Sequence, residues 1–306
     1  MGRRTTMEKH YYHIFADGAQ VRNFIVCDAD YYAVFNLIGV AAANSDVAVL
    51  SFSIEDTHPH LLIYGARRES IAFKSLFETI YRHYIAATRR GGMSMVFYCD
   101  MCQIDDVSYL RNVGTYTIVQ PTKDGKRVMP YDYFWGTGSM YFRGERYTPL
   151  WYYDKNGVMC KPRCFDSLTV REQRTILHTR QLKIPGDWVV CNGLILPENY
   201  IDVGHYEQIY RTHNCFRVFM ASPRKAESEV IERMADVRGV AMEDSEARMV
   251  CGDMCKQLFG TRDPRRLGVK ERLRLARELR LRYSLTLRQI SSLVRLPEIE
   301  VRSFVR

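Results

Sequence analysis

Two short runs of mostly β-branched and apolar residues, 47–54 and 58–64, are separated only by the polar residues 55–57. Runs of this length and composition predict β-strands, and so short a polar connection predicts that they pair as a hairpin. The second run begins with His58 and His60. Because side chains alternate between the two faces of a strand, both imidazoles are expected on the same face. The chain is therefore constrained to a β-sheet that carries a histidine pair at the mouth of one hairpin.

Two imidazoles on one face can hold a divalent metal ion, because imidazole is a ligand for several metals. The alternative is an edge strand with two solvated histidines, since Pro59 between them is tolerated at a sheet edge. The turn before them also carries Glu55 and Asp56. His13 lies in a strand predicted over 11–17, and a lone strand histidine is more often a core residue, so we keep it outside the ligand set.

A second feature follows downstream, where residues 105–119 are predicted to form a helix that ends before Pro121. Tyr116 and Gln120 are four residues apart and therefore share one face of that helix. A phenol that can act as a nucleophile thus lies beside an amide that can act as a ligand. We expect Gln120 to join the two histidines at the metal, with the acidic residues of the hairpin turn as the next candidates.

The pattern His58-Pro59-His60, followed later by Tyr116-x-x-x-Gln120-Pro121, resembles the HUH single-tyrosine transposases, including the bacterial REP-associated tyrosine transposases. The likeness runs in the same order over roughly the first half of the chain. The chain departs from the family at Pro59, where a larger apolar residue is usual, and at Thr57, where asparagine is frequent.

The resemblance implies an activity. It implies that His58, His60 and Gln120 hold Mg²⁺ or Mn²⁺, and that Tyr116 attacks single-stranded DNA at ends flanked by hairpins. The product is a 5′-phosphotyrosine intermediate, which a free 3′-hydroxyl can reverse, so strands are cut and rejoined without ATP. The resemblance also implies a homodimer in which the tyrosine helix completes either its own site or that of its partner.

Strands interleaved with helices predict an α+β fold, and the resemblance makes it the HUH ferredoxin/palm-like antiparallel sheet with flanking helices. Helices are predicted over 31–43 and 69–89, and a further strand over 93–98. We expect the catalytic domain to span residues 1–155. Basic side chains on or after the second helix are expected to contact DNA; they are Arg82, Arg89 and Arg90.

An aromatic segment lies between residues 131 and 153. Its rings include Phe134, Trp135, Tyr141 and Trp151. Such rings can stack on unpaired bases, or they can close the core of the domain. Residues 156–222 resemble the extension that follows the catalytic domain in many family members, and we assign them no chemistry.

The C-terminal part, residues 223–306, is predicted to be helical. Most of the net charge of +9 lies here, because residues 262–306 contain 13 Lys and Arg against 5 Asp and Glu. Two short helices joined by a tight turn predict a helix-turn-helix within 270–306. A basic block on such a fold indicates DNA binding; the alternative is a three-helix bundle that contacts protein. The candidate DNA contacts are Arg288, Arg295 and Arg302.

Composition limits the remaining classes. Hydrophobic residues make up 46% and charged residues 26% of the 306 residues, as in soluble proteins of about two domains. No apolar run approaches the roughly 18 residues of a membrane helix, and we expect no secretory signal at residues 1–6, because no apolar segment follows them. We therefore expect a cytoplasmic, nucleoid-associated bacterial protein with reduced thiols. Four of its nine cysteines have spacings compatible with zinc, although ordinary packing is favoured; they are Cys99, Cys102, Cys160 and Cys164.

Two rival functions stay open. A relaxase or replication initiator would use the same chemistry, often with a second tyrosine, for which Tyr109 is the nearby candidate. A catalytically inactive DNA-binding regulator would use only the C-terminal helices. Cleavage of a labelled hairpin oligonucleotide in the presence of metal separates the regulator from the two enzymes.

Overall fold

The computed structural model describes residues 8–16, 24–88, 97–123, 128–143, 148–154, 156–221, 228–231, 233–234, 244–283, 285 and 287–304. The chain divides into two compact units, residues 1–235 and residues 236–306. In the described parts of the chain, no helix is both long enough and apolar enough to cross a membrane.

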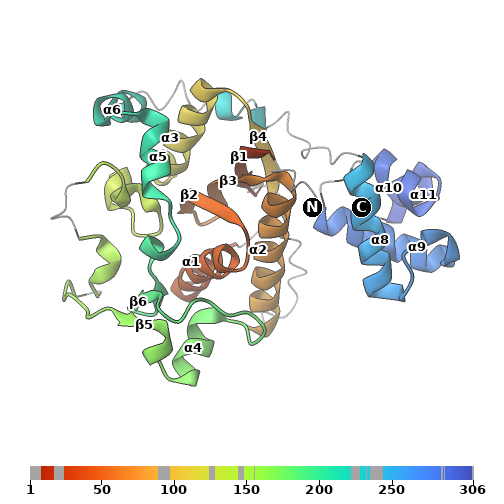
Figure 1. The fold of residues 1–306 in the computed structure, drawn as a ribbon, viewed down its shortest axis with the longest axis horizontal. Helices are drawn as coiled ribbons and strands as arrows, with labels where there is room; N and C mark the ends of the chain where they lie inside the picture. The colour runs from red at the N-terminus through yellow and green to blue at the C-terminus, as the bar shows by residue number, and fades with distance from the viewer. Residues whose placement is uncertain are drawn as a thin grey trace, which may run out of the picture. The chain divides into compact units, whose positions relative to one another are not determined.

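The first unit is built on a four-stranded antiparallel sheet with the strand order β2-β3-β1-β4 (Figure 1). Along the chain the elements follow one another as β1-α1-β2-β3-α2-β4-α3. Their bounds are β1 Lys9–Phe15, α1 Asp28–Ala43, β2 Val47–Ile54, β3 Pro59–Ala66, α2 Arg67–Ala87, β4 Asp100–Ile104 and α3 Val107–Lys123. The prediction of a mixed α and β chain with an antiparallel sheet is confirmed.

The sheet separates two layers of helix. On one face, Phe52 of β2 meets Phe35 of α1 with ring centroids 5.3 Å apart, and α2 packs beside α1 (Figure 1). On the opposite face, His60 of β3 meets Tyr116 of α3, also at 5.3 Å. The two faces follow from strand alternation, because Phe52 pairs with Leu61, the neighbour of His60. The predicted histidine face and tyrosine helix therefore meet.

The predicted hairpin is present as β2 and β3, with Ile54 opposite Pro59 and Ser53 opposite His60. However, β3 lies between β2 and β1, so the interpretation of 58–64 as an edge strand is wrong. Pro59 is tolerated because it is the first residue of the strand, a position that proline can occupy within a sheet. The closed end of this central hairpin carries the histidine pair.

Most predicted boundaries shift by two or three residues, and two differences matter for the site. Most of the strand predicted at 93–98 falls outside the described residues, and the fourth strand begins at Asp100. The helix that was predicted to end before Pro121 continues through it to Lys123. Proline removes an N–H and crowds the preceding turn, but here it lies in the last turn of the helix, where little of the ladder remains to be broken.

Short elements over residues 130–221 complete the first unit. Asn36 of α1 fastens the turn between β6 and β7, because its Nδ2 donates to the carbonyl of Gly193 and its Oδ1 accepts from the N–H of Ile195, both at 2.8 Å. The elements are η1 Pro130–Asp132, η2 Thr137–Met140, η3 Leu150–Tyr152, β5 Arg163–Cys164, η4 Phe165–Ser167, α4 Val170–Leu177, β6 Val189–Cys191, β7 Leu194–Ile195, η5 Pro197–Asn199, α5 Val203–Tyr210 and α6 His213–Ala221.

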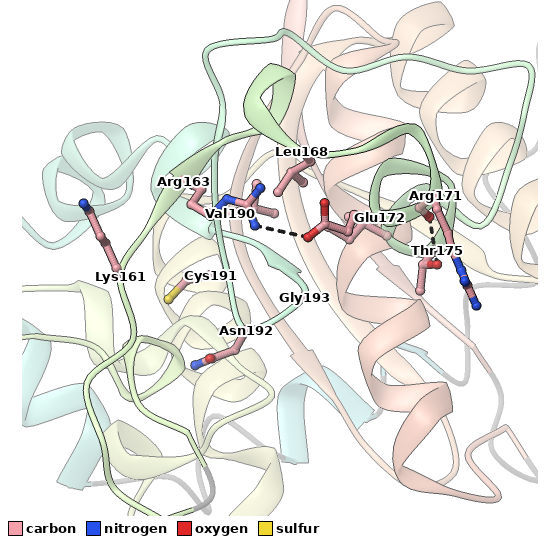
Figure 2. A pocket seen from close by; sticks show the side chains of 11 residues that line it. Lys161, Arg163, Leu168, Arg171, Glu172, Thr175, Val190, Cys191, Asn192 and Gly193 are labelled. Atoms are coloured by element: carbon pink, nitrogen blue, oxygen red, sulfur yellow. Dashed lines mark hydrogen bonds and ion pairs between the residues drawn. The ribbon is translucent and has the colours of Figure 1, made fainter.

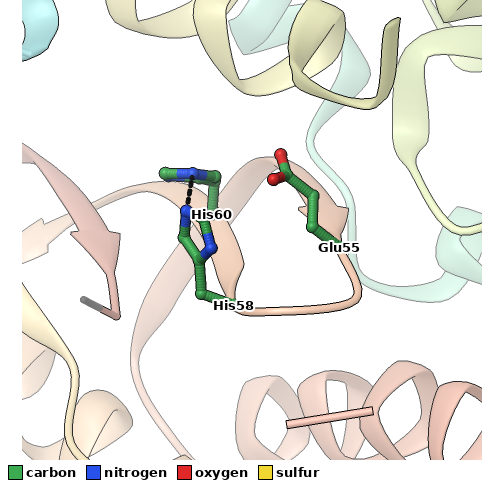
Figure 3. A group of neighbouring side chains, drawn as sticks. All are labelled: Glu55, His58 and His60. Atoms are coloured by element: carbon green, nitrogen blue, oxygen red, sulfur yellow. Dashed lines mark hydrogen bonds between the residues drawn. The ribbon is translucent and has the colours of Figure 1, made fainter. Parts of the chain in front are cut away.

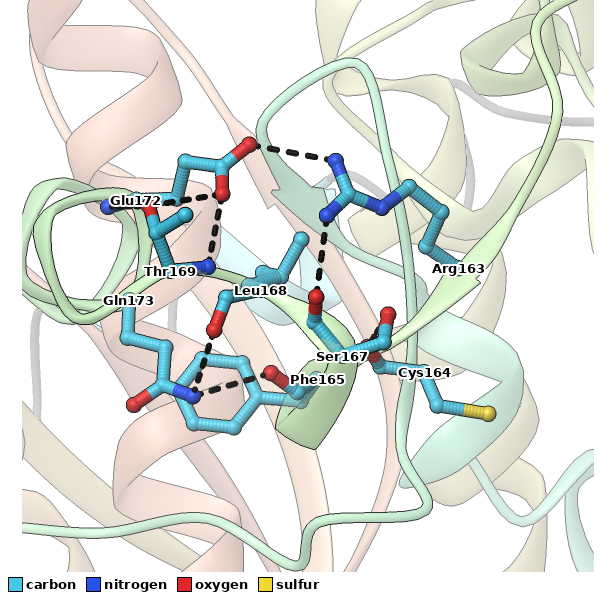
Figure 4. Close-up of polar contacts among 8 residues, drawn as sticks. All are labelled: Arg163, Cys164, Phe165, Ser167, Leu168, Thr169, Glu172 and Gln173. Atoms are coloured by element: carbon cyan, nitrogen blue, oxygen red, sulfur yellow. Dashed lines mark hydrogen bonds and ion pairs between the residues drawn. The ribbon is translucent and has the colours of Figure 1, made fainter.

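The connection between β5 and α4 is held by polar contacts (Figure 4). Thr169 and Glu172 form a capping box, in which each side chain accepts from the backbone N–H of the other. The Glu172 carboxylate also pairs with Arg163 at 3.1 Å. Gln173 Nε2 donates to the Phe165 carbonyl at 3.1 Å, so the helix start is anchored to the 3-10 turn before it.

The second unit is helical in its described residues. Its helices are α8 Asp244–Phe259, η6 Pro264–Arg266, α9 Val269–Arg282, α10 Leu287–Val294 and α11 Glu298–Phe304. Leu275 and Leu279 of α9, Ile290 of α10 and Val301 of α11 are fully buried and form its core. The two short helices α10 and α11 are joined by a turn in which Arg295 has a positive φ of 55°.

Candidate metal centre and tyrosine

The hairpin turn brings three potential metal ligands together. Glu55 directly follows β2 and His58 directly precedes β3, and the N–H of Glu55 donates to the carbonyl of His58 at 3.1 Å, which closes the turn. One ligand atom each from Glu55, His58 and His60 lie within 4.8 Å of one another (Figure 3). In the described residues this is the one such group of three or more histidine, cysteine or acidic side chains.

The spacing of the two imidazoles fits a shared cation. The Nε2 atoms of His58 and His60 are 2.9 Å apart. Two ligands bound to one ion at right angles, with bonds of about 2.1 Å, are separated by about 3.0 Å. The two Nε2 atoms are therefore spaced as two ligands of one ion would be. A bound ion would take the place of the contact between them.

The other ring nitrogens are held by neighbouring side chains. His60 Nδ1 lies 3.1 Å from His13 Nε2, and His58 Nδ1 lies 2.7 Å from Thr57 Oγ1. Histidine ligands of metals usually have such a partner on the second nitrogen, which fixes the tautomer and the ring orientation. His13 and Thr57 thus occupy the positions of orienting residues and not of ligands.

His13 has the protonation state that this role requires. Its side chain is fully buried, and burial together with the nearby His58 lowers the pKa of His13 to about 3. A neutral His13 can accept a hydrogen bond at Nε2 from the Nδ1–H of His60 when His60 Nε2 is the ligand atom. Sequence reasoning excluded His13 from the ligand set and did not identify it as an orienting residue. The signal lies in the register, because β1 pairs Phe15 with His60 and places His13 two residues along the same face.

Glu55 was only a secondary candidate in the sequence. Its side chain is 1% exposed, and burial of a carboxylate is costly without compensating hydrogen bonds or charge. Carboxylate oxygens and imidazole nitrogens are both ligands of divalent metal ions. The donor set of one carboxylate and two imidazoles therefore fits a divalent metal ion.

Tyr116 lies over the histidines. Its ring centroid is 5.3 Å from that of His60 and 6.2 Å from that of His13, with the ring planes nearly perpendicular. Gln120, one turn further along α3, is 6% exposed. Among the described contacts, none joins the Gln120 amide to a histidine.

Tyr109 has different surroundings. It is fully buried, and the Arg233 guanidinium lies 4.0 Å from its ring centroid. Burial raises the pKa of Tyr109 well above its ordinary value, and the neighbouring Cys102 adds to this. Its environment therefore disfavours the phenolate that a second nucleophile would need.

The predicted DNA-contacting arginines are placed differently from one another. The Arg82 guanidinium donates to the Phe97 carbonyl at 3.1 Å and to Thr79 Oγ1 at 3.2 Å. These hydrogen bonds within the chain give Arg82 a structural role. Arg89 and Arg90 lie outside the described residues. In the second unit the three candidates are exposed, and one of them is paired with Glu298; they are Arg288, Arg295 and Arg302.

The cysteines considered for zinc do not come together as a metal site in the described part of the chain. Cys99 and Cys102 are buried at β4, whereas Cys160 and Cys164 belong to the later segment around β5. Burial raises the pKa of Cys99 and of Cys102.

A pocket of about 330 Å³ lies between β5, α4 and the β6–β7 turn (Figure 2). Leu168, Ile176 and Val190 line it together with charged side chains. Arg163 and Glu172 are paired with each other, and Lys161 and Arg171 are the other charged residues of the lining. The pocket indicates a functional site less clearly than the histidine cluster does.

No family model, curated protein or solved structure matches this chain. The functional interpretation therefore depends on the residues and on their geometry.

Proposed function

We propose that the protein is a metal-dependent enzyme that cleaves and rejoins single-stranded DNA through Tyr116, in the manner of the HUH single-tyrosine transposases it resembles. The observation that carries the proposal is the position of the Tyr116 ring, 5.3 Å from a histidine of the Glu55–His58–His60 group. A nucleophile beside a candidate divalent-metal site is the combination that this chemistry needs.

The topology supports the proposal. The order of elements in the first unit, β1-α1-β2-β3-α2-β4, is that of a ferredoxin-type split βαβ unit, and the strand order β2-β3-β1-β4 is antiparallel throughout. This arrangement is compatible with a palm-like HUH domain, in which the sheet presents the histidines and the following helix presents the tyrosine.

The metal would be held by His58 and His60, with Glu55 as the third ligand. Gln120, which the resemblance suggests, lies on the same helix as Tyr116 and remains a candidate for a further position. The resemblance points to Mg²⁺ or Mn²⁺, and a mixed set of carboxylate and imidazole ligands suits Mn²⁺ at least as well as Mg²⁺. When bound, the cation would polarise the scissile phosphate.

The protein's own residues account for the bonds that change. The Tyr116 oxygen attacks the phosphorus, the bond between phosphorus and the 3′ oxygen breaks, and the phenol proton is lost as the 3′ oxygen gains one. The enzyme then carries a 5′-phosphotyrosine. Attack by a 3′-hydroxyl runs the same steps backwards and joins two ends, so the energy of the broken linkage is kept in the covalent intermediate.

The arrangement within one chain favours an active site made in cis. Tyr116 lies against His60 and His13 of its own chain, so a single chain holds both halves of the chemistry. A homodimer, if formed, would then pair two complete sites.

The second unit is proposed to add affinity for DNA. Exposed cations gather over 262–280, from the end of α8 through η6 and α9, and each phosphate contact by such a side chain releases counterions. By contrast, α11 begins with Glu298 and Glu300, which would repel the backbone if this helix entered a groove. We therefore propose that α9 and η6, more than the helix-turn-helix of α10 and α11, supply the phosphate contacts. Their exposed cations are Arg265, Arg266, Lys270, Arg274, Arg277 and Arg280.

The test is formation of a covalent adduct. The protein is incubated with Mn²⁺ and a single-stranded oligonucleotide that carries a hairpin, and a product that resists denaturation is sought by gel and mass spectrometry. An adduct on Tyr116 supports the proposal. Its absence, with DNA binding intact, would favour the inactive DNA-binding regulator.

A further inference from the structure

Aromatic rings gather beside the hairpin turn that carries the histidines. Trp135 stacks on Tyr31 with ring centroids 4.9 Å apart and ring planes at 13°. Tyr32 and Phe134 meet Trp135 edge to face, at 5.1 Å and 4.6 Å. These four residues, Tyr31, Tyr32, Phe134 and Trp135, are called the aromatic cluster below.

The cluster is fixed to the turn from both sides. The Tyr31 hydroxyl donates to the Asp56 carboxylate in the middle of the turn. The N–H of Ile54, the last residue of β2, donates to the Trp135 carbonyl at 2.9 Å. Glu55 lies between these two anchor points in the sequence, and His58 follows them. The rings are therefore anchored to the turn that carries the candidate metal ligands, while Trp135 also contacts Phe35 on the α1 face of the sheet, with ring centroids 6.1 Å apart.

Exposure separates three rings of the cluster from the core rings, whereas Tyr31 is itself buried, at 8%. Trp151 and Tyr141 are 0% and 2% exposed, so they belong to the core. Tyr32 is 36% exposed, and Phe134 and Trp135 are partly exposed. Neighbouring rings that stay partly exposed on a rigid support are what proteins use to stack unpaired bases.

We propose that Tyr32, Phe134 and Trp135 stack on an unpaired base of the DNA strand, close to the phosphate held at the histidine site. This inference rests on the proposed function and states how the single-stranded DNA substrate is bound. A base in single-stranded DNA lacks some of the stacking that it has in a duplex. Stacking on the aromatic rings replaces part of that lost interaction.

The test separates stacking from attraction to phosphates. The full-length Tyr116→Phe protein, which cannot cleave, is titrated without metal with two fluorescein-labelled strands of equal length. One strand is oligothymidine and the other is its abasic analogue, which has the same sugars and phosphates but no bases. The ratio of the two dissociation constants measures the contribution of the bases, because the phosphate term is common to both.

The parent protein should bind oligothymidine more tightly than the abasic strand. Adding Trp135→Leu should weaken oligothymidine binding about 5- to 100-fold, as expected for loss of one stacked base, and leave abasic binding unchanged. Trp135→Phe, which keeps a ring, should retain most of the preference. Tyr32→Leu, at an exposed position of α1, should lower it without disturbing the core.

Trp188→Leu is the matched control. Trp188 is another partly exposed tryptophan stacked on a tyrosine, Tyr200, at 5.8 Å, in the segment around β6. Its removal should leave the ratio unchanged. A ratio near one in the parent protein, or an equal ratio in the Trp135→Leu and Trp188→Leu proteins, would overturn the inference. Because binding is measured without cleavage, a failure of the proposed chemistry at Tyr116 would appear only in the adduct assay.

Discussion

The ring of Tyr116 stands nearly perpendicular to the ring of His60, with an angle of 87° between the planes and 5.3 Å between the centroids. His60 is itself held on both nitrogens, by His13 at 3.1 Å and by His58 at 2.9 Å. A side chain restrained in this way defines a fixed point, and the tyrosine lies at a fixed place relative to it. Preorganised geometry of this kind is what orientation effects in catalysis require.

The first prediction concerns the third metal ligand. Glu55→Gln should weaken Mn²⁺ binding at least about 100-fold, because loss of a ligand costs no less than loss of an outer partner. Gln120→Ala should weaken Mn²⁺ binding less, because Glu55 and not the Gln120 amide is the proposed third ligand. Isothermal titration of both variants with Mn²⁺ decides between them. A larger loss of affinity in Gln120→Ala would return the ligand role to the amide.

The second prediction concerns His13. His13→Phe should lower the Mn²⁺ affinity about 10- to 100-fold by releasing the Nδ1 side of His60. His13→Gln offers another acceptor and should recover part of the affinity. A purely structural role would instead lower the melting temperature in both variants and leave the metal affinity of the folded protein unchanged.

The third prediction concerns how the later segment is fixed to the sheet core. Asn36→Ala leaves the Gly193 carbonyl and the Ile195 N–H without their partner, which should cost about 2–4 kcal/mol of stability. All three tryptophans lie in the first unit, so tryptophan fluorescence during urea unfolding reports its stability. Asn156→Ala, in an exposed turn, is the control and should have no effect. Equal stabilities of the two variants would show that the Asn36 contacts contribute little.

The fourth prediction concerns pH. His178 ends α4 with a φ of 52° and packs on Tyr84, and burial lowers the pKa of His178 to about 4. Between about pH 6.5 and pH 4 the unfolded chain binds a proton there that the folded chain does not, so this residue makes stability fall as pH falls, by at most about 1.4 kcal/mol per unit.

His178→Asn should flatten the loss of stability on the acid side, because asparagine does not titrate and tolerates a positive φ. The measurement is urea unfolding followed by fluorescence at several values between pH 4 and pH 7. His83→Asn, at an exposed position of α2, serves as the control. An unchanged pH profile in His178→Asn would remove His178 as a cause of acid sensitivity.

Local patterns predicted the parts of the fold that depend on local physics. The apolar runs around Ser53 and Leu61 are separated by a few polar turn residues, as a hairpin requires. The hairpin formed where it was expected. The shared helical face of Tyr116 and Gln120 also followed from spacing alone, and α3 includes both.

The parts that were missed depend on pairing between distant segments. The central position of β3 follows from its pairing with β1, which no local pattern encodes. His13 and Glu55 each look ordinary in the sequence, one as a strand histidine and the other as a turn residue. They acquire a role only when the register places His13 behind His60 and the turn folds Glu55 towards His58 and His60. Pro121 was misread for the opposite reason, since a local helix-breaking rule was applied to a final turn that tolerates it.

The most direct test of the central claim is to locate the covalent attachment. The wild type, Tyr116→Phe and Tyr109→Phe proteins are incubated with Mn²⁺ and a hairpin-bearing single-stranded oligonucleotide, and tryptic peptides are analysed by mass spectrometry. Tyr109 lies on the same helix and is buried against Arg233, so it is the matched control. The account predicts a 5′-phosphonucleotide on Tyr116 in the wild type and in Tyr109→Phe, and none in Tyr116→Phe. An adduct on Tyr109, or one that survives in Tyr116→Phe, would contradict it.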